Sequence, residues 1–168
     1  MISNIIPSLV ISYLVKESGH KVSKTRLNHI TYLLAKEGFP FFSFMLDKDM
    51  LYSKELSDAL NIAVNLGMLK IVFDDDIYYV YDSDYNNVLN KGITEDMRDK
   101  IINVVNKYKN LNDFDIHLYA LYLYFKSYFN VSDEDLEDII FKLLGVYLKP
   151  TLDKLKESKD GIQENKEG

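Results

Sequence analysis

Apolar residues recur with a helical period along the first part of the chain. They predict one helix over Ile5–Glu17, which ends before Gly19. A second helix is predicted over Lys24–Glu37, with Ser23 as its N-cap and Gly38 as its stop. Gly19, Ser23 and Gly38 are thus residue types that are typical of helix boundaries.

The second predicted helix has one clear apolar stripe. Leu27, Ile30 and Leu34 share a face at helical spacing, so we expect this face to pack on the core. His29 points the other way on the helical wheel, and we interpret it as a surface histidine without a chemical role.

Period-two alternation follows the second helix. Phe42, Phe44 and Leu46 alternate with other residues, which predicts a short, largely buried strand. Ser53 is a suitable N-cap for a third helix over Lys54–Leu66. The stretch MLKIVFDDDIYYVY then reads as two strands joined by a turn, a hairpin with Asp74, Asp75 and Asp76 at its tip.

The pattern becomes helical again in the last part of the chain, and the tail is polar. We expect residues 157–168 to be disordered because they contain few apolar residues. Before this tail, the predicted helices are Thr94–Lys109, Phe114–Phe129, Asp133–Leu148 and a short one from Pro150 to about Lys156.

These elements predict an α+β fold that is mostly α. Residues 1–90 form a winged-helix-like unit whose small antiparallel sheet is the hairpin wing, and residues 91–156 form a C-terminal helical bundle packed on it. Fourteen residues, Phe39–Tyr52, separate the second and third helices. A tight helix-turn-helix has a turn of about 3–4 residues, so the unit departs from that motif.

Four segments carry a resemblance to a known family: RLNHITYLL (Arg26–Leu34), FPFFSF (Phe39–Phe44), LYSKEL (Leu51–Leu56) and LGMLKI (Leu66–Ile71). In this pattern, over about residues 5–85, the chain resembles the YwgA-like and Panacea-type (SocA-like antitoxin) proteins. Met50-Leu51 stands where that family has Gly-Pro before the tyrosine. The resemblance implies a winged-helix-like regulatory module that acts as an antitoxin or adaptor on a protein partner, without catalytic residues.

Charge is distributed unevenly along this acidic chain of formal net charge −6. Residues 1–38 carry five basic and two acidic side chains, whereas residues 39–100 carry six basic and twelve acidic ones. Arginine, which is frequent in proteins that bind phosphate backbones, occurs only at positions 26 and 98. Any contact with nucleic acid would therefore be local, and the candidates for it are Lys21, Lys24, Arg26, Lys36, Lys54 and Asn61.

The polar face of the third helix has two interpretations. Lys54, Asp58, Asn61 and Asn65 lie opposite its apolar stripe, as a solvated face would or as a surface for a protein partner. Asparagine can pair with adenine, but Asp58 would repel phosphate.

The acidic hairpin tip also favours protein over DNA. Three adjacent carboxylates at Asp74, Asp75 and Asp76 would be repelled by DNA. They form either a plain acidic turn or a surface for a basic protein partner.

The helix over residues 114–129 is apolar nearly all round. Such a helix lies either at the centre of a bundle or in an interface, so a homodimer through this helix is a further possibility. Tyr119, Tyr124 and Tyr128 are candidate partner contacts because tyrosine suits surfaces that become buried on binding.

No pattern of catalytic or metal-binding residues is present. His20, His29 and His117 lie far apart, no phosphate-binding or nucleophile motif occurs, and the chain has no cysteine. The first fifteen residues are interrupted by polar positions and do not predict a membrane span or a signal peptide. We therefore expect a cytoplasmic, non-enzymatic protein without cofactor, metal or membrane contact.

The leading hypothesis is a regulatory module that binds a protein partner through the third-helix face, the acidic hairpin or the aromatic helix. The alternative is a winged-helix transcriptional regulator that binds DNA through the basic residues given above.

Overall fold

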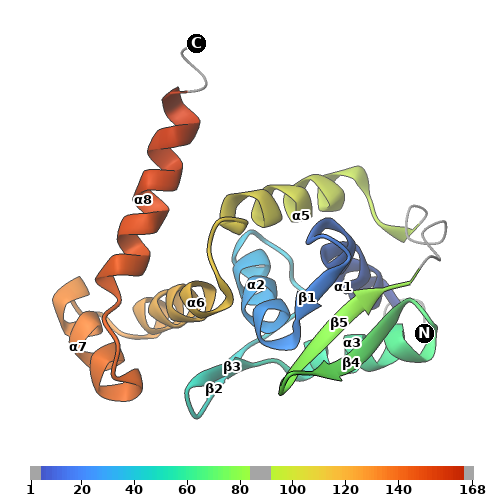
Figure 1. Ribbon diagram of the computed structural model, residues 1–168, viewed down its shortest axis with the longest axis horizontal. Helices are drawn as coiled ribbons and strands as arrows, with labels where there is room; N and C mark the ends of the chain where they lie inside the picture. Colours follow the sequence, from blue (N-terminus) through green and yellow to red (C-terminus); the bar gives the residue numbers. More distant parts are fainter. Residues whose placement is uncertain (1–4, 84–91, 165–168) are drawn as a thin grey trace.

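The computed structural model describes residues 5–83 and 92–164, and side chains up to residue 157 (Figure 1). The helices, in chain order, are α1 (Ile5–Glu17), α2 (Lys24–Lys36), α3 (Lys54–Asn65), α5 (Glu95–Tyr108), α6 (Asp113–Tyr128), α7 (Asp133–Leu144) and α8 (Lys149–Glu164). The strands are β1 (Lys21–Ser23), β2 (Met45–Asp47), β3 (Met50–Tyr52), β4 (Leu69–Asp74) and β5 (Ile77–Asp82).

Helices α1 and α2 form the centre of the molecule. Helix α1 is apolar on most sides and packs mainly against α3 and α5, while α2 packs against α6 and α5 (Figure 1). Two serines occur inside α1 without cost, because Ser8 donates to the carbonyl of Ala59 in α3 and Ser12 donates to Ser8. The core therefore lies mainly between helices, and Val22, Leu69 and Val80 of the larger sheet join it.

The larger sheet has the strand order β1-β5-β4, with all pairs antiparallel. The β4–β5 hairpin was predicted, and the pairing of Asp74 with Ile77 leaves Asp75 and Asp76 as its two-residue loop. Strand β1 was not predicted. It has only three residues, too few to show alternation, and its pairing with β5 depends on contacts distant in sequence.

The segment between α2 and α3 differs from the prediction. The expected strand over Phe42–Leu46 begins only at Met45, and this strand, β2, forms a small antiparallel hairpin with β3 around Lys48 and Asp49. Phe42 is buried although it lies in the irregular chain before β2. Of the alternating apolar residues, Leu46 therefore pairs in β2, whereas Phe42 and Phe44 lie in irregular chain before it.

The C-terminal helices continue the same core. Buried side chains extend without interruption from Leu9 in α1 to Leu155 in α8, and α7 and α8 pack against α6. The predicted boundary near residue 90 thus does not separate two hydrophobic cores.

Two helix ends differ from the prediction by more than one residue. Helix α7 ends at Leu144 rather than Leu148, because Gly145 adopts a left-handed conformation with φ of 70° and its N–H bonds the Phe141 carbonyl. Helix α8 continues to Glu164, whereas the sequence predicted an end near Lys156 and disorder from 157. Residues 165–168 of that expected tail lie outside the described residues.

The prediction of an α+β fold that is mostly α, with a small antiparallel sheet, is confirmed. Of the helices in residues 5–83 and 92–164, none combines the length and the apolar character needed to cross a membrane.

Candidate functional site

A groove of about 430 Å³ lies between the two hairpins and the first turns of α2 and α3. Its size falls within the range of about 300–1,000 Å³ that is usual for ligand pockets. Figure 1 shows β2–β3 and the turn end of β4–β5 at the same edge of the molecule, below α2. The groove is lined by Lys24, Thr25, Leu27, Asn28, Asp47, Met50, Leu51, Tyr52, Ser53, Leu56, Ser57, Leu60, Asn61, Ile71, Asp76, Ile77 and Tyr78.

The apolar part of the groove comes from residues that belong to the core. Leu27 of α2, Leu51 of β3 and Leu56 of α3 are almost fully buried and present only part of their side chains to it. Ser53 fixes the start of α3, because its hydroxyl accepts a hydrogen bond from the Leu56 N–H. Asn28 fixes β3 against α2 by donating to the Leu51 carbonyl. The floor of the groove is thus held by capping and side-chain hydrogen bonds.

The rim of the groove exposes large apolar side chains. Tyr52 is 43% exposed, Ile77 42% and Tyr78 52%, and each lines the groove. Such residues normally lose water contact on folding, so their exposure around a concave surface is typical of a binding site.

Both hairpin turns have strained backbone. Lys48 in the β2–β3 turn has φ of 58°, and Asp75 and Asp76 have φ of 46° and 62°. Two successive positive φ values in a two-residue loop indicate a type I′ turn, for which Asn-Gly is the preferred sequence. The Asp75–Asp76 pair therefore occupies a turn that other residues would favour more.

The charged residues that line the groove are mostly acidic. Asp47 and Asp76 come from different hairpins, and neither forms an ion pair within the part of the chain that the structure describes. Lys24 is the basic lining residue, and its Nζ lies 5.7 Å from the centre of the Tyr78 ring. Lys24 therefore contacts an aromatic ring and forms no ion pair with Asp47 or Asp76 among the described residues.

The α3 residues predicted to contact a partner are all exposed. Lys54 pairs with Asp58 over 2.9 Å, whereas Asn61 lines the groove and Asn65 lies at the other end of the helix. The groove thus includes one of these four residues, and it includes Asp76 but not Asp74 or Asp75 from the hairpin tip.

The three candidate tyrosines of α6 lie elsewhere. Tyr119 and Tyr124 are half-buried and contact other rings, including Tyr108 and Tyr32 respectively, and only Tyr128 is fully on the surface. Helix α6 is therefore mainly a core helix, packed between α2 and the last two helices.

The candidate nucleic-acid residues do not form one cluster. Lys21 lies over the rings of Tyr79 and Tyr81 in the sheet. Lys24 and Asn61 line the groove beside Asp76, and Lys54 pairs with Asp58. Lys36 lies at the other end of α2, about 18 Å from Lys24 along the helix axis at 1.5 Å per residue. Its ammonium group donates to the hydroxyl of Ser127.

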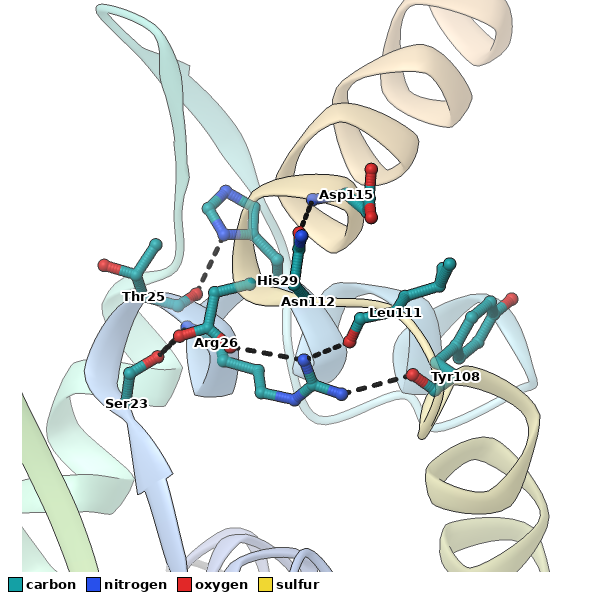
Figure 2. A network of polar contacts seen from close by, with 9 residues as sticks. Ser23, Thr25, Arg26, His29, Tyr108, Leu111, Asn112 and Asp115 are labelled. Carbon is teal, nitrogen blue, oxygen red and sulfur yellow. Dashed lines mark hydrogen bonds and ion pairs between the residues drawn. The ribbon is translucent and has the colours of Figure 1, made fainter. Parts of the chain in front are cut away.

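Arg26, also predicted as a phosphate contact, is instead a structural residue (Figure 2). Its guanidinium donates to the carbonyl of Leu111 over 2.7 Å and to that of Tyr108 over 3.1 Å, and it pairs with Asp113 over 3.2 Å. Its side chain is only 16% exposed. These bonds hold α2 against the connection between α5 and α6.

His29 was interpreted as a surface residue, and this was wrong: it is fully buried against His117 of α6. Its Nδ1–H donates to the Thr25 carbonyl, while Nε2 has no partner (Figure 2). Burial and the neighbouring His117 lower the pKa of His29 to about 4, so the ring is neutral at pH 7. The helical wheel missed this because α2 is covered on two faces, one of them by α6.

The described side chains do not form a metal site. Nowhere in residues 5–83 and 92–164 do three side chains among His, Cys, Asp and Glu come together as metal ligands would.

No protein-family model, curated protein or solved structure matches the chain. Its function therefore has to be inferred from the groove and its rim.

Proposed function

We propose that the chain is a non-enzymatic regulatory module that binds a protein partner through the groove between its hairpins. The observation that carries this proposal is the exposure of Tyr52, Ile77 and Tyr78 around a concave, largely apolar surface. Aromatic and aliphatic side chains in such a position commonly anchor protein interfaces.

The order of elements agrees with this proposal. Helix α1, strand β1, helix α2, the β2–β3 hairpin, helix α3 and the β4–β5 hairpin follow one another along the chain, and β1 joins β4–β5 in one sheet. We infer a winged-helix-like unit in which β4–β5 is the wing. The resemblance of Arg26–Leu34 and Leu51–Leu56 to the YwgA-like and Panacea-type proteins adds the expectation of an antitoxin-like or adaptor-like role.

Fewer observations support the alternative of a DNA-binding regulator. Arg26 uses its donors within the chain, and Lys24 shares the groove with Asp76. A phosphate backbone near the wing would meet Asp74, Asp75 and Asp76.

Site-specific photocrosslinking in the source cells tests the proposal. A photoreactive phenylalanine analogue replaces Tyr52 at the groove in one variant and Tyr147, an exposed tyrosine after α7, in the control. We expect a discrete protein adduct from position 52 that position 147 does not give. Identical adducts from both positions, or none from position 52, would contradict the proposal.

A further inference from the structure

The charges of the groove allow the partner to be described further. We propose, on the basis of the protein-binding function above, that the groove receives a cationic amphipathic segment of the partner. The segment's apolar side chains would lie between the hairpins, and its Lys or Arg side chains would meet Asp47 and Asp76.

The apolar half of this inference follows from the walls of the groove. Leu51, Leu60 and Ile71 supply the interior, and Tyr52 and Ile77 supply exposed apolar surface on opposite hairpins. A segment that inserts apolar residues would bury Tyr52 and Ile77 together. Burial of apolar surface is the main source of affinity in such grooves.

The cationic half follows from the position of the carboxylates. Asp47 lies at the end of β2 and Asp76 in the β4–β5 turn, so acidic groups stand on both sides of the apolar interior. Asp74 and Asp75 add negative charge next to Asp76, while Lys24 is engaged by the Tyr78 ring. A partner with positive flanks is complementary to this arrangement, whereas an acidic one would be repelled.

The test uses the purified full chain and a library of random 12-residue peptides displayed on phage. Peptides are selected on the wild-type chain and counter-selected on the Ile77→Asp variant, which places a charge on the apolar rim. We expect the enriched peptides to contain at least two large apolar residues with Lys or Arg beside them. Enrichment of acidic or uncharged peptides, or no enrichment, would overturn the inference.

Matched variants then test the site with the strongest selected peptide, by fluorescence anisotropy. Ile77→Asp is expected to abolish measurable binding, and Leu143→Asp on α7, at a residue equally exposed (43%), is expected to leave it unchanged. The double variant Asp47→Asn/Asp76→Asn should weaken binding about tenfold and reduce its salt dependence. Asp138→Asn/Asp153→Asn carries the same change in net charge on α7 and α8 and should retain wild-type affinity. Equal weakening by both double variants would show that only the net charge of the chain matters. It would overturn the inference that Asp47 and Asp76 contact the peptide.

Failure of this inference can be distinguished from failure of the proposed function. If position 52 crosslinks a protein in cells but the library yields no basic peptides, the groove binds a partner of different chemistry. If position 52 gives no adduct, the protein-binding function itself is wrong.

Discussion

The imidazole rings of His29 and His117 stack with centroids 4.4 Å apart and planes inclined by 26°. His117 donates from Nε2 to the Asp49 carbonyl, and His29 donates from Nδ1 to Thr25. The stack therefore joins α2, α6 and the β2–β3 turn through two rings. A positive charge on the buried His29 would be unfavourable, both by desolvation and by repulsion from His117.

This stack predicts a loss of stability in mild acid. The unfolded chain protonates His29 near its ordinary pKa of 6.5, but the folded chain does so only near 4. Since the unfolded state binds the additional proton, the free energy of unfolding decreases as pH falls through this interval. Between pH 7.5 and pH 5.0 we expect a loss of about 2 kcal/mol in urea denaturation.

The variant His29→Gln should show a much smaller loss over the same pH interval, because it cannot titrate. His20→Gln, at an exposed position in contact with Asp82, serves as the control and should retain the loss. An unchanged pH dependence in His29→Gln would rule out His29 as its source.

Arg26 is expected to contribute to stability. Replacing it with alanine removes bonds to Leu111, Tyr108 and Asp113 and leaves carbonyl groups without a donor. We expect Arg26→Ala to lower the free energy of unfolding by about 2–3 kcal/mol. Arg26→Lys should recover only part of it, because an ammonium group cannot reproduce the fork of the guanidinium.

Lys24→Ala is the matched control for Arg26, since it removes a positive charge from an exposed position on the same helix turn. It should change stability by less than about 0.5 kcal/mol. Similar effects of Arg26→Ala and Lys24→Ala in urea denaturation would show that charge rather than the hydrogen-bond network accounts for the loss.

The acidic turn is expected to favour binding at the expense of stability. Replacing Asp75-Asp76 by Asn-Gly suits the left-handed φ values of the turn and should stabilise the fold by about 0.5–1 kcal/mol. The same change should reduce crosslinking from position 52. Lys48→Gly relieves left-handed backbone in the other hairpin but keeps the carboxylates, so it should raise the melting temperature without reducing crosslinking. Lower stability of the Asn-Gly variant would contradict this interpretation.

Binding to double-stranded DNA is expected to be absent. A mobility-shift titration with random duplex at low salt should show no complex, because the basic side chains are dispersed and the wing tip is acidic. A shift that weakens steeply with salt would instead favour the regulator alternative, and Lys21→Ala should then reduce it.

The sequence predicted most helices because their boundaries depend on neighbouring residues. Ser23, Ser53, Thr94 and Ser132 all cap helices as N-cap residues usually do. Strand β1 and the β2–β3 hairpin were missed because they are three residues long and are fixed by pairing rather than by local pattern.

The candidate site was only partly predictable for the same reason. Asp76 and Asn61 were singled out from their local patterns, and both line the groove. Asp47, Tyr52 and Ile77 were not, because their exposure depends on how two hairpins lie beside α3. Arg26 and His29 were misassigned because both contact segments after residue 90, which a helical wheel of α2 does not include.

The contacts of Arg26 and His117 link the shape of the groove to residues that lie outside it. Arg26 precedes the groove residue Leu27, and His117 holds the turn next to Met50, yet neither side chain lines the groove. Helix α2 and the β2–β3 hairpin, which form two walls of the groove, are thus held in place by hydrogen bonds to α6 and to the connection before α6. Substitutions in these distant helices can therefore alter which ligands fit, and a fragment cut near residue 90 would lose that support.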